Sequence, residues 1–281
     1  MRRADINMKA LIAIIVVLLV FIVLAGFYLK IHGSILKNSD REVCKTSVLA
    51  QSVTINVPSG EKLVTPDCKT YNVVFFEDHV EINGKTAEVY DPQKGDYVSK
   101  FNSLTSGIVN SVVAEELRWC WYQFLEGQKK IFSRGGVVGQ VQLSVPDLCF
   151  LCDEISFDST VKVSEFTGFY DYLQSATMRN ANMTYYDYLA EEPRICESYE
   201  DKPCWEEFFK DKIADETGWS SPDQTVMKSD SKYVVTFIKH GEEGRLIGTV
   251  GVGWRENYFA YIMPADSLSK RCDSLMRGSA K

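Results

Sequence analysis

Residues 106–126 read SGIVNSVVAEELRWCWYQFLE, and this stretch decides the fold class. Its apolar side chains recur at spacings of three and four residues, which places them on one face of an amphipathic helix. They are Val109, Val113, Leu117, Cys120, Trp121 and Phe124. Gly127 follows the run as a natural C-terminal cap. We predict a helix whose aromatic residues, Trp119, Trp121 and Tyr122, belong to the core rather than to a ligand pocket.

Strand-like sequence lies on both sides of this helix. Candidate strands are residues 52–57, 71–76, 85–90 and 137–144, with a β-meander at 233–240, 246–254 and 258–263. Asn83-Gly84 is a strong hairpin signal. Shorter helices are expected at 166–176, 184–192, 205–214 and 266–276. Strands, then helices, then strands predict an α+β fold with one mixed, mainly antiparallel sheet and packed helices.

Residues 10–29 read ALIAIIVVLLVFIVLAGFYL and contain no charged side chain. As a helix this segment is about 30 Å long, the thickness of the hydrocarbon core of a bilayer. We predict a transmembrane helix that acts as an uncleaved signal anchor. The rival interpretation is a signal peptide cleaved after Ala25.

The anchor divides the chain into four expected parts. Residues 1–9 form a short cytoplasmic tail, 10–29 the transmembrane helix, 30–45 a stalk and 46–277 a disulfide-containing extracytoplasmic domain. Positive charges flank the helix almost equally on both sides. The short N-terminal tail and the cysteines favour a cytoplasmic N-terminus. The expected location is the cell membrane, crossed once, with the domain outside.

Composition and charge narrow the classes of partner. The chain has 281 residues, of which 45% are hydrophobic and 25% charged, as in ordinary globular proteins. Its net charge of -7 is concentrated in the acidic stretch 187–216. The chain has no basic stripe or arginine-rich run, which argues against nucleic acid as a partner.

The eight cysteines all follow the anchor. They are Cys44, Cys68, Cys120, Cys149, Cys152, Cys196, Cys204 and Cys272. An even count in a presumed outer domain predicts disulfides. Proximity favours the pairs Cys44–Cys68 and Cys196–Cys204, and it leaves the remaining connectivity open.

Cys149-Phe150-Leu151-Cys152 is the sharpest local motif. A redox pair would place Cys149 at the N-terminus of a helix, where the dipole lowers the thiol pKa. The alternating residues that follow predict a strand instead. A zinc site would need further ligands, for which Cys120, Cys196 and Cys204 are available. Disulfide-bonded or packing cysteines are the favoured interpretation.

Other catalytic signatures are absent from the sequence. It has no P-loop, GxSxG, HExxH or EF-hand pattern, and we predict no catalytic residue and no cofactor. The three histidines, His32, His79 and His240, are expected in solvated or capping roles. Glu115 and Glu116 are expected on a solvated, locally paired helix face.

One modification motif and one helix cap stand out in residues 182–187. Asn182-Met183-Thr184 is a single N-glycosylation sequon. Thr184 and Asp187 have the spacing of a capping box.

The central motifs carry a resemblance. Trp119-Cys120-Trp121-Tyr122-x-Phe124, Cys149-Phe150-Leu151-Cys152 and Phe157-Asp158 resemble those of a group of uncharacterised single-pass membrane proteins of small-genome archaea. The resemblance covers the anchor, this central third and the C-terminal meander. It implies the architecture given above and no activity.

The sequence therefore favours a non-enzymatic, membrane-anchored extracytoplasmic domain that binds a protein or envelope partner. One alternative is a membrane-tethered thiol–disulfide oxidoreductase that uses Cys149 and Cys152. Another is a zinc-binding domain, either structural or hydrolytic.

Overall fold

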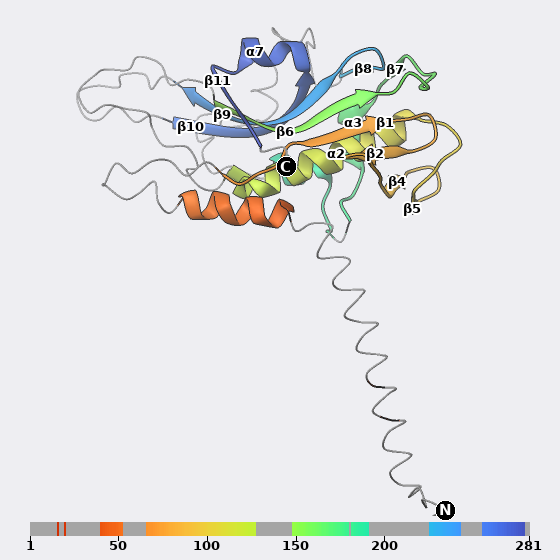
Figure 1. Ribbon diagram of the computed structural model, residues 1–281, viewed down its shortest axis with the longest axis horizontal. Helices are drawn as coiled ribbons and strands as arrows, with labels where there is room; N and C mark the ends of the chain where they lie inside the picture. The colour runs from red at the N-terminus through yellow and green to blue at the C-terminus, as the bar shows by residue number, and fades with distance from the viewer. Residues whose placement is uncertain are drawn as a thin grey trace, which may run out of the picture.

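The described part of the chain folds as α+β around a mixed, seven-stranded sheet (Figure 1). The computed structural model describes residues 40–52, 66–127, 148–179, 181–190, 225–242 and 255–278, with Val16 and Val20. Parallel and antiparallel pairs occur in the same sheet, as the sequence predicted. The expected domain class is therefore confirmed.

The expected transmembrane helix has to be corrected. Among the described residues, no helix is both long enough and apolar enough to cross a membrane. The segment 10–29 lies outside the described residues, apart from Val16 and Val20. Within the described residues, the architecture is that of an α+β domain.

The main sheet has the order β10-β9-β6-β1-β2-β3, and β11 also pairs with β6. Its strands are β1 (Tyr71–Phe75), β2 (Val80–Ile82), β3 (Lys85–Thr86), β6 (Leu148–Phe157), β9 (Tyr233–Glu242), β10 (Arg255–Pro264) and β11 (Ser274–Arg277). Two small ribbons pair β4 (Val89–Asp91) with β5 (Asp96–Val98), and β7 (Glu165–Phe166) with β8 (Met227–Lys228).

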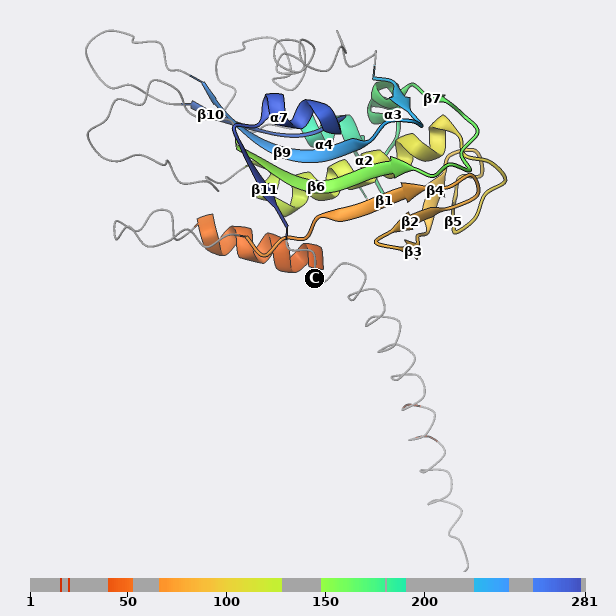
Figure 2. The same cartoon turned by 45° about the horizontal axis from the view of Figure 1, so that its top comes forward.

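The helices form layers on the two faces of this sheet. They are α2 (Ser106–Gln123), α3 (Phe169–Ser175), α4 (Tyr185–Ala190) and α7 (Leu268–Arg271), with 3-10 turns η1 (Leu125–Gly127) and η4 (Ala265–Ser267). α2 and α7 lie on opposite faces of the sheet (Figures 1 and 2). Residues 40–52 form a further helix on the α2 side.

The long amphipathic helix is confirmed as α2, and its apolar face fills the core. The ring of Phe124 stacks on Phe237 of β9, with centroids 4.4 Å apart, and lies 4.8 Å from Phe150 of β6. Trp121 is also buried and lies 5.8 Å from Phe237. Thr105 caps the helix by accepting a hydrogen bond from the amide of Ile108.

β6 is the central strand, and its two edges are used differently. One edge pairs antiparallel with β9 along its length. On the other edge, Leu148–Leu151 pairs in parallel with β11, and Asp153–Phe157 pairs in parallel with β1. Elements from both ends of the described chain therefore meet on this one strand.

A β-bulge interrupts β6 at Cys152. Leu151 lies opposite Thr236 and Asp153 lies opposite Val235, so Cys152 is an extra residue in the register. In a regular strand, neighbouring side chains point to opposite faces. The bulge lets Cys152 and Asp153 both face α2, where one is disulfide-bonded to Cys120 and the other is hydrogen-bonded to Glu116.

The predicted stalk, residues 30–45, overlaps the folded domain. The chain is helical from residue 40, and the helix 40–52 buries Arg41, Cys44, Val48 and Gln51. These positions follow the three- and four-residue spacing of one helix face. Residues 40–45 therefore belong to the domain. The expected strand 52–57 lies outside the described residues, except for Ser52, which is helical.

Several predicted elements changed in extent. The Asn83-Gly84 hairpin is confirmed as the turn between β2 and β3, with positive φ at both residues. The expected strand 85–90 is split between β3 and β4. The closing helix ends at Arg271, because residues from Ser274 pair with β6. Residues 137–144, 205–214 and 246–254 lie outside the described residues.

We predict that Phe124→Ala lowers the free energy of unfolding by about 3–5 kcal/mol, because it leaves a cavity beside the rings of Phe150 and Phe237. Val163→Ala, at an exposed position after β6, is the control and should change stability by less than about 0.5 kcal/mol. Urea unfolding with the disulfides intact measures both. Equal effects of the two substitutions would contradict this assignment of the core.

Candidate functional site

Cys149 and Cys152 lie on β6 and do not bond to each other. Cys149 pairs with Cys272, just after α7, and Cys152 pairs with Cys120 of α2. Residues three apart in a strand project from opposite faces. The motif therefore fastens one helical layer to each face of the sheet. The strand also lacks the helix N-terminus that a redox-active cysteine pair requires.

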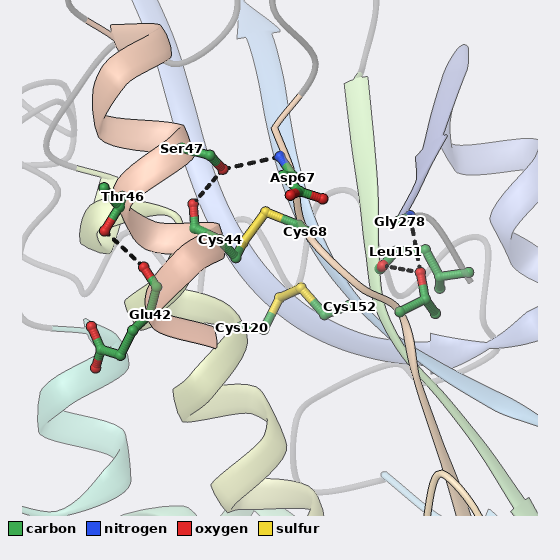
Figure 3. The surroundings of a disulfide bond; sticks show 11 residues. Glu42, Cys44, Thr46, Ser47, Asp67, Cys68, Cys120, Leu151, Cys152 and Gly278 are labelled. Carbon is green, nitrogen blue, oxygen red and sulfur yellow. Dashed lines mark hydrogen bonds between the residues drawn. A yellow bond between two sulfur atoms is a disulfide. The ribbon is translucent and has the colours of Figure 1, made fainter. Parts of the chain in front are cut away.

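The predicted bridge between Cys44 and Cys68 is confirmed, with Cα atoms 4.4 Å apart. It joins the helix 40–52 to the segment that leads into β1 (Figure 3). No cysteine is free within the described ranges, and those ranges hold no cluster of residues suited to a metal ion. Cys196 and Cys204 lie outside the described residues. Cys120, Cys149 and Cys152 are bridged and cannot serve together as zinc ligands in this state.

A buried polar cluster lies between α2, β6 and the helix 40–52. The guanidinium of Arg41 donates to the carboxylate of Glu116, and Asp153 is hydrogen-bonded to the same carboxylate. The faces of Tyr71 and Trp119 lie 4.4 and 5.1 Å from the Arg41 guanidinium carbon. Glu116 and Cys120 are one turn apart on α2, so the cluster and the Cys120–Cys152 disulfide connect the same two elements.

The electrostatics of this cluster favour the protonated form of Asp153. Burial, and then the charge of Glu116, raise the pKa of Asp153 well above its usual value, although Arg41 acts in the opposite direction. The Asp153 carboxyl therefore keeps its proton and donates to Glu116. Burial disfavours the charged form of Arg41, but the neighbouring Glu116 carboxylate raises its pKa. One cation, one anion and one neutral acid leave the cluster without net charge.

The cluster lies inside the fold and is closed to solvent. Arg41, Glu116 and Asp153 are 6%, 3% and 2% exposed. The prediction that Glu116 lies on a solvated helix face was therefore wrong. Sequence reasoning missed Arg41 because it placed the residue in a stalk. The spacing of Arg41, Cys44 and Val48 was the available signal.

The exposed side of α2 carries a second set of polar and aromatic residues. We define the outer stripe as Glu115, Arg118, Trp119 and Tyr122, which share one face of α2, together with Glu126 of η1 just beyond the helix. All five side chains are half-buried. Trp121, by contrast, is in the core, so the prediction that all three aromatic residues are core residues holds for this one alone.

Contacts link the four members of the outer stripe that lie on α2. Arg118 donates to both carboxylate oxygens of Glu115, over 2.7 and 3.0 Å, and its guanidinium lies 4.1 Å from the Trp119 ring. The ring of Tyr122 meets Trp119 edge-on at 5.5 Å. The predicted local pairing of Glu115 is thus confirmed. Each large side chain of the stripe has a fixed neighbour, which limits the rotamer entropy that binding would cost.

Neighbouring helices frame the outer stripe. From the helix 40–52, Lys45 lies 3.2 Å from the centroid of the Tyr122 ring, and Glu42 accepts a hydrogen bond of 3.2 Å from the Tyr122 hydroxyl. From α4, Tyr185 donates to Glu115 at 3.0 Å and Tyr188 donates to Glu126 at 2.8 Å. Burial first, and then the nearby carboxylates, raise the pKa of both α4 tyrosines, so their hydroxyls stay protonated as donors.

Among the three histidines, only His79 has a described side chain. Its Nδ1 lies 2.6 Å from the Asp78 carboxylate, and its ring stacks on Phe76. Its Nε2 lies 3.6 Å from the carboxylate of Glu81. The ring packs in the turn between β1 and β2.

No protein-family model, curated protein or solved structure matches the chain. The resemblance to archaeal membrane proteins therefore stays an expectation. Any function has to be argued from the disulfides, the buried cluster and the outer stripe.

We predict that Asp153→Asn removes a component of the pH dependence of stability. In the unmodified protein, folded Asp153 keeps a proton that the unfolded chain loses above its usual pKa of 3.8, so folding takes up a proton. Stability should therefore fall as the pH rises from about 4 toward the raised folded-state pKa. The asparagine amide can still donate to Glu116 without titrating.

Urea unfolding from pH 4 to pH 8 tests this prediction. The variant should show a flatter stability profile and should be at least as stable as the unmodified protein at pH 8. Glu165→Gln, at an exposed carboxylate of β7, is the matched control and should leave the profile unchanged. Identical profiles for Asp153→Asn and the unmodified protein would show that Asp153 does not hold this proton.

Proposed function

We propose that this domain acts outside the cytoplasm, in an oxidising compartment, as a binding domain, and that the outer stripe of α2 contacts a protein partner. The outer stripe is the observation that carries the proposal. Tryptophan, tyrosine and arginine dominate the energetics of protein interfaces, and the stripe presents all three side by side. Mixed charges at its borders suit a polar rim.

Support for the extracytoplasmic location comes from the disulfides. Three bridges connect the described cysteines, and all but Cys272 are nearly inaccessible to solvent. Stable structural disulfides are typical of oxidising compartments and rare in the reducing cytosol. Each bridge joins separate elements of the fold, as expected for structural rather than transient bonds.

The same bridges weigh against the oxidoreductase alternative. Cys149 and Cys152 would have to leave two different disulfides and then approach each other from opposite faces of β6. That movement would break the pairing of the central strand with its neighbours. A catalytic dithiol instead alternates between two states with little rearrangement of its surroundings.

Thiol counting on natively purified protein tests the location. We predict that Cys44, Cys68, Cys120, Cys149, Cys152 and Cys272 resist alkylation until the denatured protein is reduced. Intact mass and peptide mapping identify the blocked positions. Free thiols at all of these positions would contradict the extracytoplasmic location. Free thiols at Cys149 and Cys152 alone would instead favour redox chemistry at that pair.

Substitution in the outer stripe tests the binding surface. A photo-crosslinking residue at Arg118 should trap a discrete protein partner in the native envelope. We predict that Tyr122→Ala reduces the yield of this adduct about 10-fold or more, since loss of a central aromatic anchor typically costs at least about 2 kcal/mol.

Tyr122→Phe keeps the ring and is the matched control, which should retain most of the adduct. Near-ultraviolet circular dichroism and the disulfide pattern report whether each variant is folded. If Tyr122→Ala is folded and traps the same adduct in equal yield, the outer stripe is not the contact surface.

A further inference from the structure

We propose that Asn182 is an N-glycosylation site and that it receives its glycan while the chain crosses into the compartment in which its disulfides form. The inference rests on the proposed extracytoplasmic location, and it adds a modification that the binding role does not require. The folded structure places the motif in a setting that can accommodate a glycan once it is attached.

The motif itself is complete. Asn182-Met183-Thr184 satisfies the pattern Asn-x-Ser/Thr with a residue other than proline in the middle. This pattern occurs once in the sequence. A single acceptor makes the proposal easy to test, because loss of one side chain should remove all glycan.

Asn182 lies near the tip of a closed loop between α3 and α4. The amide of Met178 donates to the carbonyl of Met183 at 3.0 Å, and the amide of Ala181 donates back to the carbonyl of Met178 at 3.2 Å. Thr177 and Thr184 form a bridge at the base of the loop. Met178 is buried and anchors the loop, whereas Asn182 is exposed. A glycan on Asn182 would therefore extend into solvent without displacing core residues.

Thr184 has a second role in the folded domain, and this fixes the order of events. Its hydroxyl accepts a hydrogen bond from the amide of Asp187 at 3.0 Å, and the Asp187 carboxylate accepts one from the amide of Thr184. The predicted capping box of α4 is thus confirmed. Since the sequon depends on the same hydroxyl, transfer of the glycan should precede closure of this cap.

The chemistry needs a co-reactant of one class, a lipid-phosphate-linked oligosaccharide. The Asn182 amide nitrogen forms a bond to the anomeric carbon of the first sugar. The bond from that carbon to the phosphate oxygen of the lipid carrier breaks, and the carrier phosphate leaves with the electron pair. The amide nitrogen loses one proton, and no oxidation or reduction occurs.

Cell-free translation of the full chain behind a cleavable secretion signal, with endoplasmic-reticulum microsomes, tests the acceptor. We expect a protease-protected product whose mobility shift is removed by an amide-cleaving glycosidase. Asn182→Gln and Thr184→Ala should abolish the shift, and Thr184→Ser should retain it. Asp187→Ala is the matched control, because it breaks the cap of α4 while it leaves the sequon intact, and it should still be shifted.

Two results would overturn the proposal. One is a protected product without a shift, and the other is a shift that persists in Asn182→Gln. The same translation without the added signal examines the location separately. A protected product supports the proposed location whether or not Asn182 is modified, whereas a protease-accessible product overturns that location and with it the modification in the native setting.

Discussion

β6 is constrained on both edges and both faces, and the rest of the domain is arranged around it. β9 follows one edge, while β1 and β11 divide the other. Cys149 fastens the chain after α7 to one face, and Cys152 fastens α2 to the other. A slip of one residue would turn each side chain of β6 to the wrong face. The fixed partners on both edges and both faces therefore specify a single register. The bulge at Cys152 is a local departure that adds Asp153 to the α2 face.

The buried polar cluster illustrates how charges are accommodated beside this strand. An isolated arginine in the interior would be very unfavourable, and even a buried ion pair adds little net stability. Here Glu116 balances Arg41, and a protonated Asp153 occupies a further acceptor site on the carboxylate. The cluster instead specifies the position of the helix 40–52. When Arg41 of this helix contacts Glu116, Cys44 of the same helix is bonded to Cys68. The helix 40–52 is thus located by two independent contacts.

Sequence patterns predicted the elements that depend on interactions between residues close together in the chain. The amphipathic period gave α2, Asn83-Gly84 gave the turn after β2, and short separation gave the Cys44–Cys68 bridge. Long-range pairing was inaccessible, since nothing near Cys272 indicates that β11 will pair with Leu148–Leu151. The role of Glu116 was missed for the same reason: its partner Arg41 is 75 residues away. The bulge at Cys152 also has no signal in the motif, because it arises from register against β9.

The arrangement of the three bridges has a mechanical consequence. If the chain were pulled from its two ends, tension would pass through the Cys44–Cys68 disulfide and then along the backbone to Cys120. From there it would cross the Cys120–Cys152 disulfide, run along β6 to Cys149 and leave through the Cys149–Cys272 disulfide. The backbone between Cys152 and Cys272, which includes α3, α4, β9 and β10, would carry no load. α4, which borders the outer stripe, would stay outside the force path even as α2 was stretched. In the oxidised domain, residues between Cys152 and Cys272 would therefore be protected from extension, and reduction of the bridges would expose the long loop that contains β9 and β10 to the force.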